Sequence, residues 1–202
     1  MAIQAQIHRR IKGRGRGAVF TPKDFVDLGS RAAVDQSLSR LAHDGVLVRL
    51  RNGVYHYPKT HPRLGTLAPD ADTVARALVG NAPLQVTGAS AVNALGLSTQ
   101  VPARTSYWSD RSYKDVPIGQ RVVSIRKASP RRLAAAGRPS GPVIQALKHL
   151  GPDNVGPRVV KKLRVTLPQS TKDDLRTFVK RNPRTVPDWM QLPVSQITSD
   201  AK

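Results

Sequence analysis

The sequence contains no cysteine and no glutamate, and only 4% of its 202 residues are aromatic. The absence of cysteine excludes disulfides, thiolate zinc sites and cysteine nucleophiles. The absence of glutamate excludes the His-Glu-x-x-His metalloprotease motif. Apolar runs are only a few residues long, whereas a membrane-spanning helix needs about 20 apolar residues. Because the N-terminal residues are polar and basic rather than an apolar signal core, we expect a cytoplasmic protein that does not contact membranes.

Negative charge is also scarce. The chain has 33 Lys and Arg residues against 13 Asp, which gives a net charge of +20 and a pI of about 11.4. Residues 1–62 carry 11 basic and 4 acidic side chains, and residues 129–202 carry 14 and 5. A surplus of this size attracts polyanions. We therefore expect nucleic acid as the leading partner.

Motifs for catalysis and cofactor binding are missing from the sequence. It has no Gly-x-x-x-x-Gly-Lys-Ser/Thr loop and no Gly-x-Ser-x-Gly elbow, and its five histidines show no ligand-like pairing on one helix. Asp70 and Asp72 could chelate a metal, but they stand where a helix N-cap is expected. The sequence thus predicts no catalytic residue, no cofactor and no metal site, and so a protein that is not an enzyme.

Two helices are predicted near the N-terminus. Ile3, Ile7 and Ile11 recur at the spacing of one helix face, which predicts a helix over about residues 2–12. Thr21 has the position of an N-cap, and Pro22 follows at the first helical position. This arrangement predicts a second, short helix.

A third helix is predicted from the N-cap Ser30 to Asp44. Val34, Leu38 and Leu41 lie at i, i+4 and i+7 and form its buried face. The three predicted helices have the spacing of a helix-turn-helix unit.

A hairpin is predicted directly after these helices. Residues 46–51 and 54–57 have the pattern of strands, and Asn52-Gly53 between them is a strong hairpin-turn signal. Three helices followed by a β-hairpin have the outline of a winged helix-turn-helix. In that fold the third helix enters the major groove and the hairpin contacts phosphates.

The proline- and glycine-rich stretch 58–65 is interpreted as a linker, with a domain boundary near residue 62. Beyond it, the patterns predict helices near residues 72–78, 88–95, 140–150, 156–164 and 170–181, with strands near 84–87, 105–108 and 122–126, the last two paired around a polar loop. The predicted fold class is α+β, with a winged helix-turn-helix DNA-binding domain (1–62) followed by a mixed α/β domain (63–202).

The outward face of the third predicted helix is small and polar. A helical projection places Ala32, Gln36, Ser39 and His43 opposite the buried face. Small side chains let a helix backbone approach base edges closely. A solvated face of a protein-interaction domain would show the same pattern, so the helix alone leaves both alternatives open.

Neighbouring side chains match the hydrogen-bonding groups of bases. Arg31 and Arg40 offer guanidinium groups to guanine, and Gln36 suits adenine. Asp35 could accept a hydrogen bond from a cytosine amino group. Ser30 and the first N–H groups of the helix could bind a phosphate.

The predicted hairpin and the turn before Gly17 supply positive charge. Arg49 and Arg51 alternate with apolar residues and so share one side of the hairpin, where they could contact phosphates or merely keep an edge strand soluble. The turn Arg14-Gly15-Arg16 is interpreted as a loop that contacts phosphate. The predicted DNA-binding residues are Thr21, Lys23, Ser30, Arg31, Ala32, Asp35, Gln36, Ser39, Arg40, Arg49, Arg51, Asn52, Gly53 and Tyr55.

Basic runs in the second part of the chain are interpreted differently. Arg131-Arg132 and residues 161–164 are more often solvated helix faces than binding sites, although they add to the long-range field. Trp189 is interpreted as a hydrophobic anchor of the C-terminal region.

Ordered motifs along nearly the whole chain resemble one known family. They are residues 20–25 (FTPKDF), 28–36 (LGSRAAVDQ), 38–41 (LSRL), 51–58 (RNGVYHYP), 61–65 (HPRLG), 90–98 (SAVNALGLS), 143–147 (VIQAL) and 187–190 (PDWM). With these motifs the chain is similar to the AbiEi-like antitoxins of type IV toxin–antitoxin systems.

The resemblance implies a bacterial phage-defence antitoxin with two activities. Its winged helix-turn-helix domain would repress its own promoter by binding inverted repeats in double-stranded DNA. Its C-terminal domain would counter a nucleotidyltransferase-type toxin, with direct contact between the two proteins left open. The chain is shorter after residue 62 than the longer members, so its antitoxic surface could be reduced or different.

Two other functions remain to be distinguished. A nucleic-acid-processing enzyme or an RNA-binding accessory factor could use the winged helix as a clamp, but an enzyme needs a catalytic cluster that the sequence does not supply. A nonspecific basic coating protein would lose affinity with added salt on every nucleic-acid sequence alike.

Overall fold

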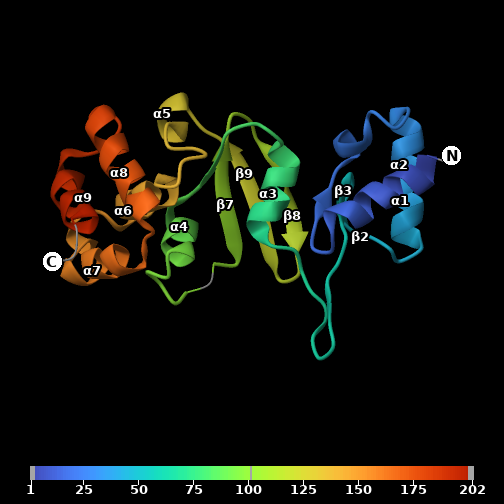
Figure 1. The fold of residues 1–202 in the computed structure, drawn as a ribbon, viewed down its shortest axis with the longest axis horizontal. Helices are drawn as coiled ribbons and strands as arrows, with labels where there is room; N and C mark the ends of the chain where they lie inside the picture. The colour runs from blue at the N-terminus through green and yellow to red at the C-terminus, as the bar shows by residue number, and fades with distance from the viewer. Residues whose placement is uncertain (1–2, 101, 200–202) are drawn as a thin grey trace. The chain divides into compact units, whose positions relative to one another are not determined.

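The computed structural model describes residues 3–100 and 102–199 and has an α+β fold, with helices and three small sheets (Figure 1). The chain divides into two compact units. Unit 1 comprises residues 1–81 and 114–123, and unit 2 comprises residues 82–113 and 124–202. These units divide the chain differently from the boundary predicted near residue 62, because residues 63–81 pack with the N-terminal part. None of the described helices is long and apolar enough to cross a membrane.

The first helices of unit 1 form where the apolar spacing predicts them. Helix α1 (Ile3–Arg14) buries Ile7 and Ile11; residue 2, where the prediction began, lies outside the described residues. The predicted second helix is only a 3-10 turn, η1 (Pro22–Phe25), because its hydrogen bonds close over three residues around a capping box of Thr21 and Asp24.

Helix α2 (Arg31–His43) confirms the predicted third helix. The Ser30 Oγ accepts a hydrogen bond from the Ala33 N–H at 3.4 Å and so caps the helix. Val34, Leu38 and Leu41 are buried and pack in one core with the aromatic residues Phe20, Phe25 and Tyr55.

A three-stranded antiparallel sheet completes this core. Strands β1 (Val19–Phe20), β3 (Val54–His56) and β2 (Val48–Arg51) are hydrogen-bonded in that order. Gly53 has a φ of 73°, which the tight Asn-Gly turn requires. A register shift between Arg49 and Arg51 places a bulge in β2. The predicted hairpin is therefore present, with β2 starting two residues later than expected.

The stretch interpreted as a linker is a second, smaller hairpin. Strands β4 (Thr60–His61) and β5 (Gly65–Thr66) pair antiparallel, and residues 59–66 are exposed. The His61 Nδ1 accepts the N–H groups of Arg63 and Leu64 at 3.2 and 3.3 Å and closes the tip. Figure 1 shows this turquoise hairpin extending from the rest of unit 1.

Helix α3 (Ala71–Val79) follows, capped by the Asp70 carboxylate, which accepts the Thr73 N–H at 3.0 Å. A four-stranded sheet then forms from β6 (Leu84–Val86), β7 (Arg104–Ser109), β9 (Arg121–Lys127) and β8 (Tyr113–Ile118), in that order. The predicted polar loop between the last two strands is wrong, because it contains β8. Val116 and Ile118 alternate with exposed residues there and are buried.

The helices of unit 2 surround a large apolar core. They are α4 (Gly88–Ala94), α5 (Pro130–Leu133), α6 (Gly141–Leu150), α7 (Pro157–Thr166), α8 (Gln169–Arg181) and α9 (Gln191–Thr198), with short 3-10 turns η2 (Pro152–Asn154) and η3 (Asp188–Met190). Ile144, Leu147, Leu163, Leu175 and Ile197 are among the buried residues of this core.

One carboxylate ties α8 to the start of α6. Asp174 accepts hydrogen bonds from the Ser140 N–H at 3.1 Å and from the Ser140 hydroxyl at 2.6 Å, and it pairs with Arg138. Burial raises the pKa of Asp174, but the hydrogen bonds from Ser140 and Arg138 outweigh it and leave the pKa below its ordinary value.

Candidate nucleic-acid interface

Helix α2 has two sharply different faces. Val34 and Leu38 are completely buried, whereas Ala32, Gln36 and Ser39 on the opposite face are exposed. The outward face predicted from the helical projection is therefore confirmed, and Arg40 and His43 extend it toward the C-terminal end of the helix. This surface is small and polar, so another molecule can approach the helix backbone closely.

Two predicted base-contacting residues bind each other. The Arg31 Nε lies 2.8 Å from an Asp35 carboxylate oxygen, and both side chains are largely exposed. An exposed i, i+4 ion pair contributes little stability, so it can open or rearrange at low cost. The pair also leaves the terminal amino groups of Arg31 available as donors.

The two hairpin arginines are not equivalent. Arg49 is exposed, lies over the Tyr55 ring at 5.4 Å and donates a hydrogen bond to the Tyr55 hydroxyl at 3.0 Å. Arg51 is half-buried and donates to the Lys114 backbone carbonyl at 2.9 Å. The prediction assumed unbroken alternation along the strand, and the bulge between these residues interrupts it.

Two of the predicted contact residues are buried. Thr21 is 8% exposed because its hydroxyl donates to Asp24 within the capping box, and Tyr55 is 2% exposed because its ring belongs to the apolar core. Neither side chain is available at the surface. Lys23 and Asn52 are exposed, and Gly53 is half-buried at the hairpin turn.

Further positive side chains lie around the same core. Arg14 lies over the Phe20 ring at 5.9 Å, and Arg16 lies over the Tyr57 ring at 4.9 Å and donates to the Pro58 carbonyl. Protein contacts thus hold the guanidinium groups of the Arg14-Gly15-Arg16 turn. Lys59 and Arg63 on the exposed second hairpin add positive charge that was not predicted, because their stretch was interpreted as a linker.

The histidine in this sheet does not add to the positive charge. His56 is buried in β3, and burial lowers its pKa, so the ring is neutral near pH 7. Within residues 3–100 and 102–199, no group of three or more His or Asp side chains is placed to hold a metal ion.

Comparisons with known proteins identify one family and one similar structure. No curated protein matches the chain. The crystal structure of the Rv2827c protein from Mycobacterium tuberculosis is similar over 96% of this chain and 82% of that chain, with 18% sequence identity and a TM-score of 0.41. The model of a family of unknown function, DUF6088, matches residues 6–175. The chain therefore belongs to the DUF6088 family.

Proposed function

We propose that this chain is a sequence-specific double-stranded DNA-binding protein of the winged helix-turn-helix type. In this proposal α2 is the recognition helix and the β2–β3 hairpin is the wing. The observation that carries it is the outward face of α2. A helix anchored by Val34 and Leu38 exposes only small and polar groups at Ala32, Gln36 and Ser39, and a hairpin with the exposed Arg49 follows it directly.

The proposed roles follow from the exposure of each side chain and, for Arg51, from its contact with the protein. Gln36 and Arg40 are exposed on α2 and would read base edges. Arg49 and Lys23 are exposed outside the helix and would contact phosphates, which orient a protein without specifying sequence. Arg51 is bound to the Lys114 carbonyl and would make the smaller contribution.

We further propose that this DNA-binding protein is a cytoplasmic, non-enzymatic antitoxin that represses its own promoter. The support is the ordered set of motifs that resembles the AbiEi-like antitoxins. The resemblance implies inverted repeats as the binding site, and so two copies of the chain for each site. A nucleotidyltransferase-type toxin would be its functional partner.

Footprinting of the full chain on the DNA upstream of its own gene tests the proposal. We expect protection of an inverted repeat, with a preference over a scrambled duplex that persists at 200 mM salt. A protein that makes about 6–10 phosphate contacts loses about 10³–10⁵ in affinity between about 50 and 200 mM salt. Binding that disappears equally from both duplexes would leave only a nonspecific basic protein and would overturn the proposal.

Two further assays distinguish the alternatives. Incubation with labelled DNA and RNA in the presence of magnesium should give no turnover, and cleavage or modification would instead favour a processing enzyme. Arg49→Ala should weaken binding to all duplexes alike and lower the salt slope by about 1. The control is Lys161→Ala, because Lys161 is an exposed cation on α7 in unit 2 and its loss should leave the slope nearly unchanged.

A further inference from the structure

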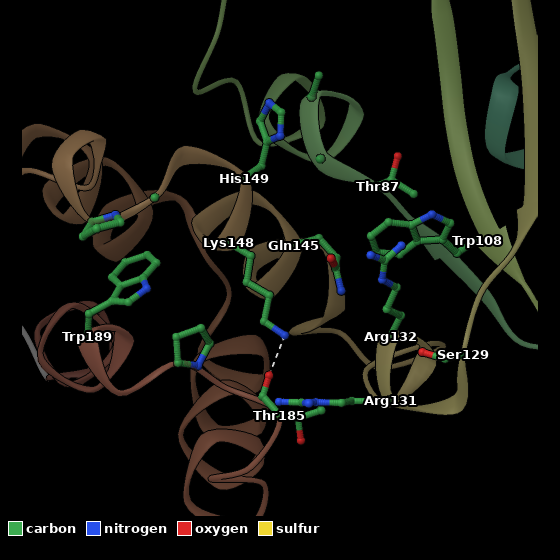
Figure 2. Close-up of a pocket in the computed structure, with 15 residues that line it drawn as sticks. Thr87, Trp108, Ser129, Arg131, Arg132, Gln145, Lys148, His149, Thr185 and Trp189 are labelled. Carbon is green, nitrogen blue, oxygen red and sulfur yellow. Dashed lines mark hydrogen bonds between the residues drawn. The ribbon is translucent and has the colours of Figure 1, made fainter.

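Unit 2 contains a cavity of about 820 Å³ that the proposed function does not use (Figure 2). Its walls come from α4, β7, α5, α6 and the segment after α8, so residues from Thr87 to Trp189 contribute to it. The volume lies within the range of small-molecule sites. The cavity is therefore large enough for a ligand of nucleotide size.

The charge in this cavity has one sign. Arg131, Arg132 and Lys148 line it, and none of the described residues that line it is an aspartate. Asp153 and Asp188 are adjacent in sequence to lining residues but do not line the cavity themselves. An anion would therefore find several cations and no repelling carboxylate on these walls.

Arg131 and Lys148 converge on one short segment. The Lys148 Nζ donates to the Thr185 carbonyl at 2.6 Å, and an Arg131 amino group donates to the neighbouring Arg184 carbonyl at 2.6 Å. Figure 2 shows Lys148 reaching Thr185 from α6 and Arg131 pointing toward Thr185 from α5. Each cation binds a neutral carbonyl rather than a carboxylate, and each has further N–H donors.

The positive charges of Arg131 and Lys148 repel each other. Burial, and then repulsion by Arg131, lower the pKa of Lys148 below its ordinary value. An oxyanion between the two side chains would relieve that repulsion and accept charge-assisted hydrogen bonds from both. A phosphate group has the oxygen atoms to do so.

Two aromatic side chains are a second feature of the cavity. The chain has two tryptophans, Trp108 and Trp189, and both line this cavity and are half-buried. The Arg132 guanidinium lies over the Trp108 ring at 5.1 Å, so one face of that indole is covered. Planar bases stack on aromatic side chains with little dependence on base identity. The walls thus combine positive charge with apolar, planar surfaces.

We infer that this cavity binds a nucleoside 5′-monophosphate unit, either free or at the 5′ end of a nucleic-acid strand. Its phosphate lies between Arg131 and Lys148, and its base packs against an indole. Arg131 and Arg132 are exposed, as expected for a solvated helix face, and the proposal adds a binding role to them. Trp189 keeps its anchoring contacts with the apolar core and also faces the ligand.

Tryptophan fluorescence of the full chain tests this directly, because both reporters lie in the cavity. Adenosine 5′-monophosphate should quench the emission saturably, and inorganic phosphate should compete with it. Adenosine without phosphate should not bind in the same concentration range. A 5′-phosphorylated oligonucleotide that competes better than its 5′-hydroxyl form would identify a strand end, whereas equal and weak competition by the two would identify the free nucleotide.

Matched variants separate a built site from general attraction to a basic protein. Lys148→Gln removes the charge but keeps a donor for the Thr185 carbonyl, and it should weaken adenosine 5′-monophosphate binding about 10- to 100-fold. Lys161→Gln makes the same charge change at an exposed position outside the cavity and should have little effect. Trp108→Phe and Trp189→Phe each leave one reporter and show which indole contacts the base.

Three outcomes would overturn the inference. One is the absence of saturable quenching by millimolar adenosine 5′-monophosphate in a protein whose circular dichroism shows it folded. The second is an equal loss of binding in Lys148→Gln and Lys161→Gln. The third is binding of inorganic phosphate as tightly as the nucleotide, because the base would then contribute nothing. DNA binding by α2 is measured separately, so neither result depends on the other.

Discussion

The surface of α2 and the cavity of unit 2 are both basic regions, but among the described residues only the α2 surface pairs a cation with a carboxylate. Around α2, Arg31 pairs with the Asp35 carboxylate, and Arg49 lies over the Tyr55 ring. In the cavity, Arg131 and Lys148 donate to backbone carbonyls, and Arg132 lies over the Trp108 ring. Net charge thus indicates a class of partner, whereas the immediate neighbours of each cation indicate the kind of ligand. An exposed, convex face suits a duplex, and a concave, uncompensated one suits a small anion.

The largest expected effect tests whether the two faces of α2 differ as described. Leu38→Ala removes a completely buried side chain from the core of unit 1 and should lower the free energy of unfolding by about 2–5 kcal/mol. The neighbouring Ser39→Ala alters the exposed face and should change it by less than about 0.5 kcal/mol. Urea unfolding followed by circular dichroism measures both. Equal effects would mean that the helix is not packed on one face only.

A smaller effect tests the packing that supports the cavity. Asp174→Asn removes the charge that accepts both Ser140 hydrogen bonds and pairs with Arg138, and should cost about 1.5–3 kcal/mol. Asp173→Asn is the control, because Asp173 is an exposed neighbour on α8. Urea unfolding followed by tryptophan fluorescence reports unit 2 specifically. Indistinguishable midpoints would show that Asp174 does not tie α8 to α6.

The same carboxylate gives unit 2 a defined acid dependence. The folded pKa of Asp174 is depressed, so its stabilisation is complete above the ordinary aspartate pKa of about 3.9 and is lost as the pH falls through the folded value. The free energy of unfolding of Asp174→Asn should therefore decrease less than that of the wild type as the pH falls below about 4. An equal decrease in the stability of the two proteins over this pH range would contradict the prediction.

The smallest effect concerns His56 in unit 1. Because burial lowers its folded pKa, the unfolded chain takes up a proton first as the pH falls. Stability is therefore complete above the ordinary histidine pKa of about 6.5 and decreases below it until the folded pKa is reached. His56→Gln should flatten this dependence below about pH 7. Unfolding followed by circular dichroism at several pH values measures it, and an unchanged pH dependence in the variant would contradict the prediction.

The sequence predicted an element correctly where the residues that determine it lie within one short segment. The Ser30 cap with Val34, Leu38 and Leu41 predicted α2, and Asn52-Gly53 predicted the hairpin. The burial of Tyr55 was missed because alternation shows which residues share a face, but not which face the core covers. The bulge in β2 added a second error, since it breaks the alternation that grouped Arg49 with Arg51.

The cavity could not be predicted because it has no local pattern. Its walls bring together Thr87, Trp108, Arg131, Lys148 and Trp189, which are separated by up to about a hundred residues. In the sequence, Arg131-Arg132 has the appearance of a solvated helix face and Trp189 that of an apolar anchor. Only tertiary packing places these side chains around one space, and pairwise spacing along the chain contains no information about it.

The most direct measurement is the affinity of Gln36→Ala for two duplexes at 200 mM salt. Fluorescence anisotropy would compare the footprinted promoter sequence with a scrambled duplex, and Gln191→Ala, at an exposed position in unit 2, would be the control. We expect Gln36→Ala to lose about 1–3 kcal/mol of binding free energy on the promoter alone. Equal losses on both duplexes, or no loss on either, would show that the outward face of α2 does not read DNA sequence.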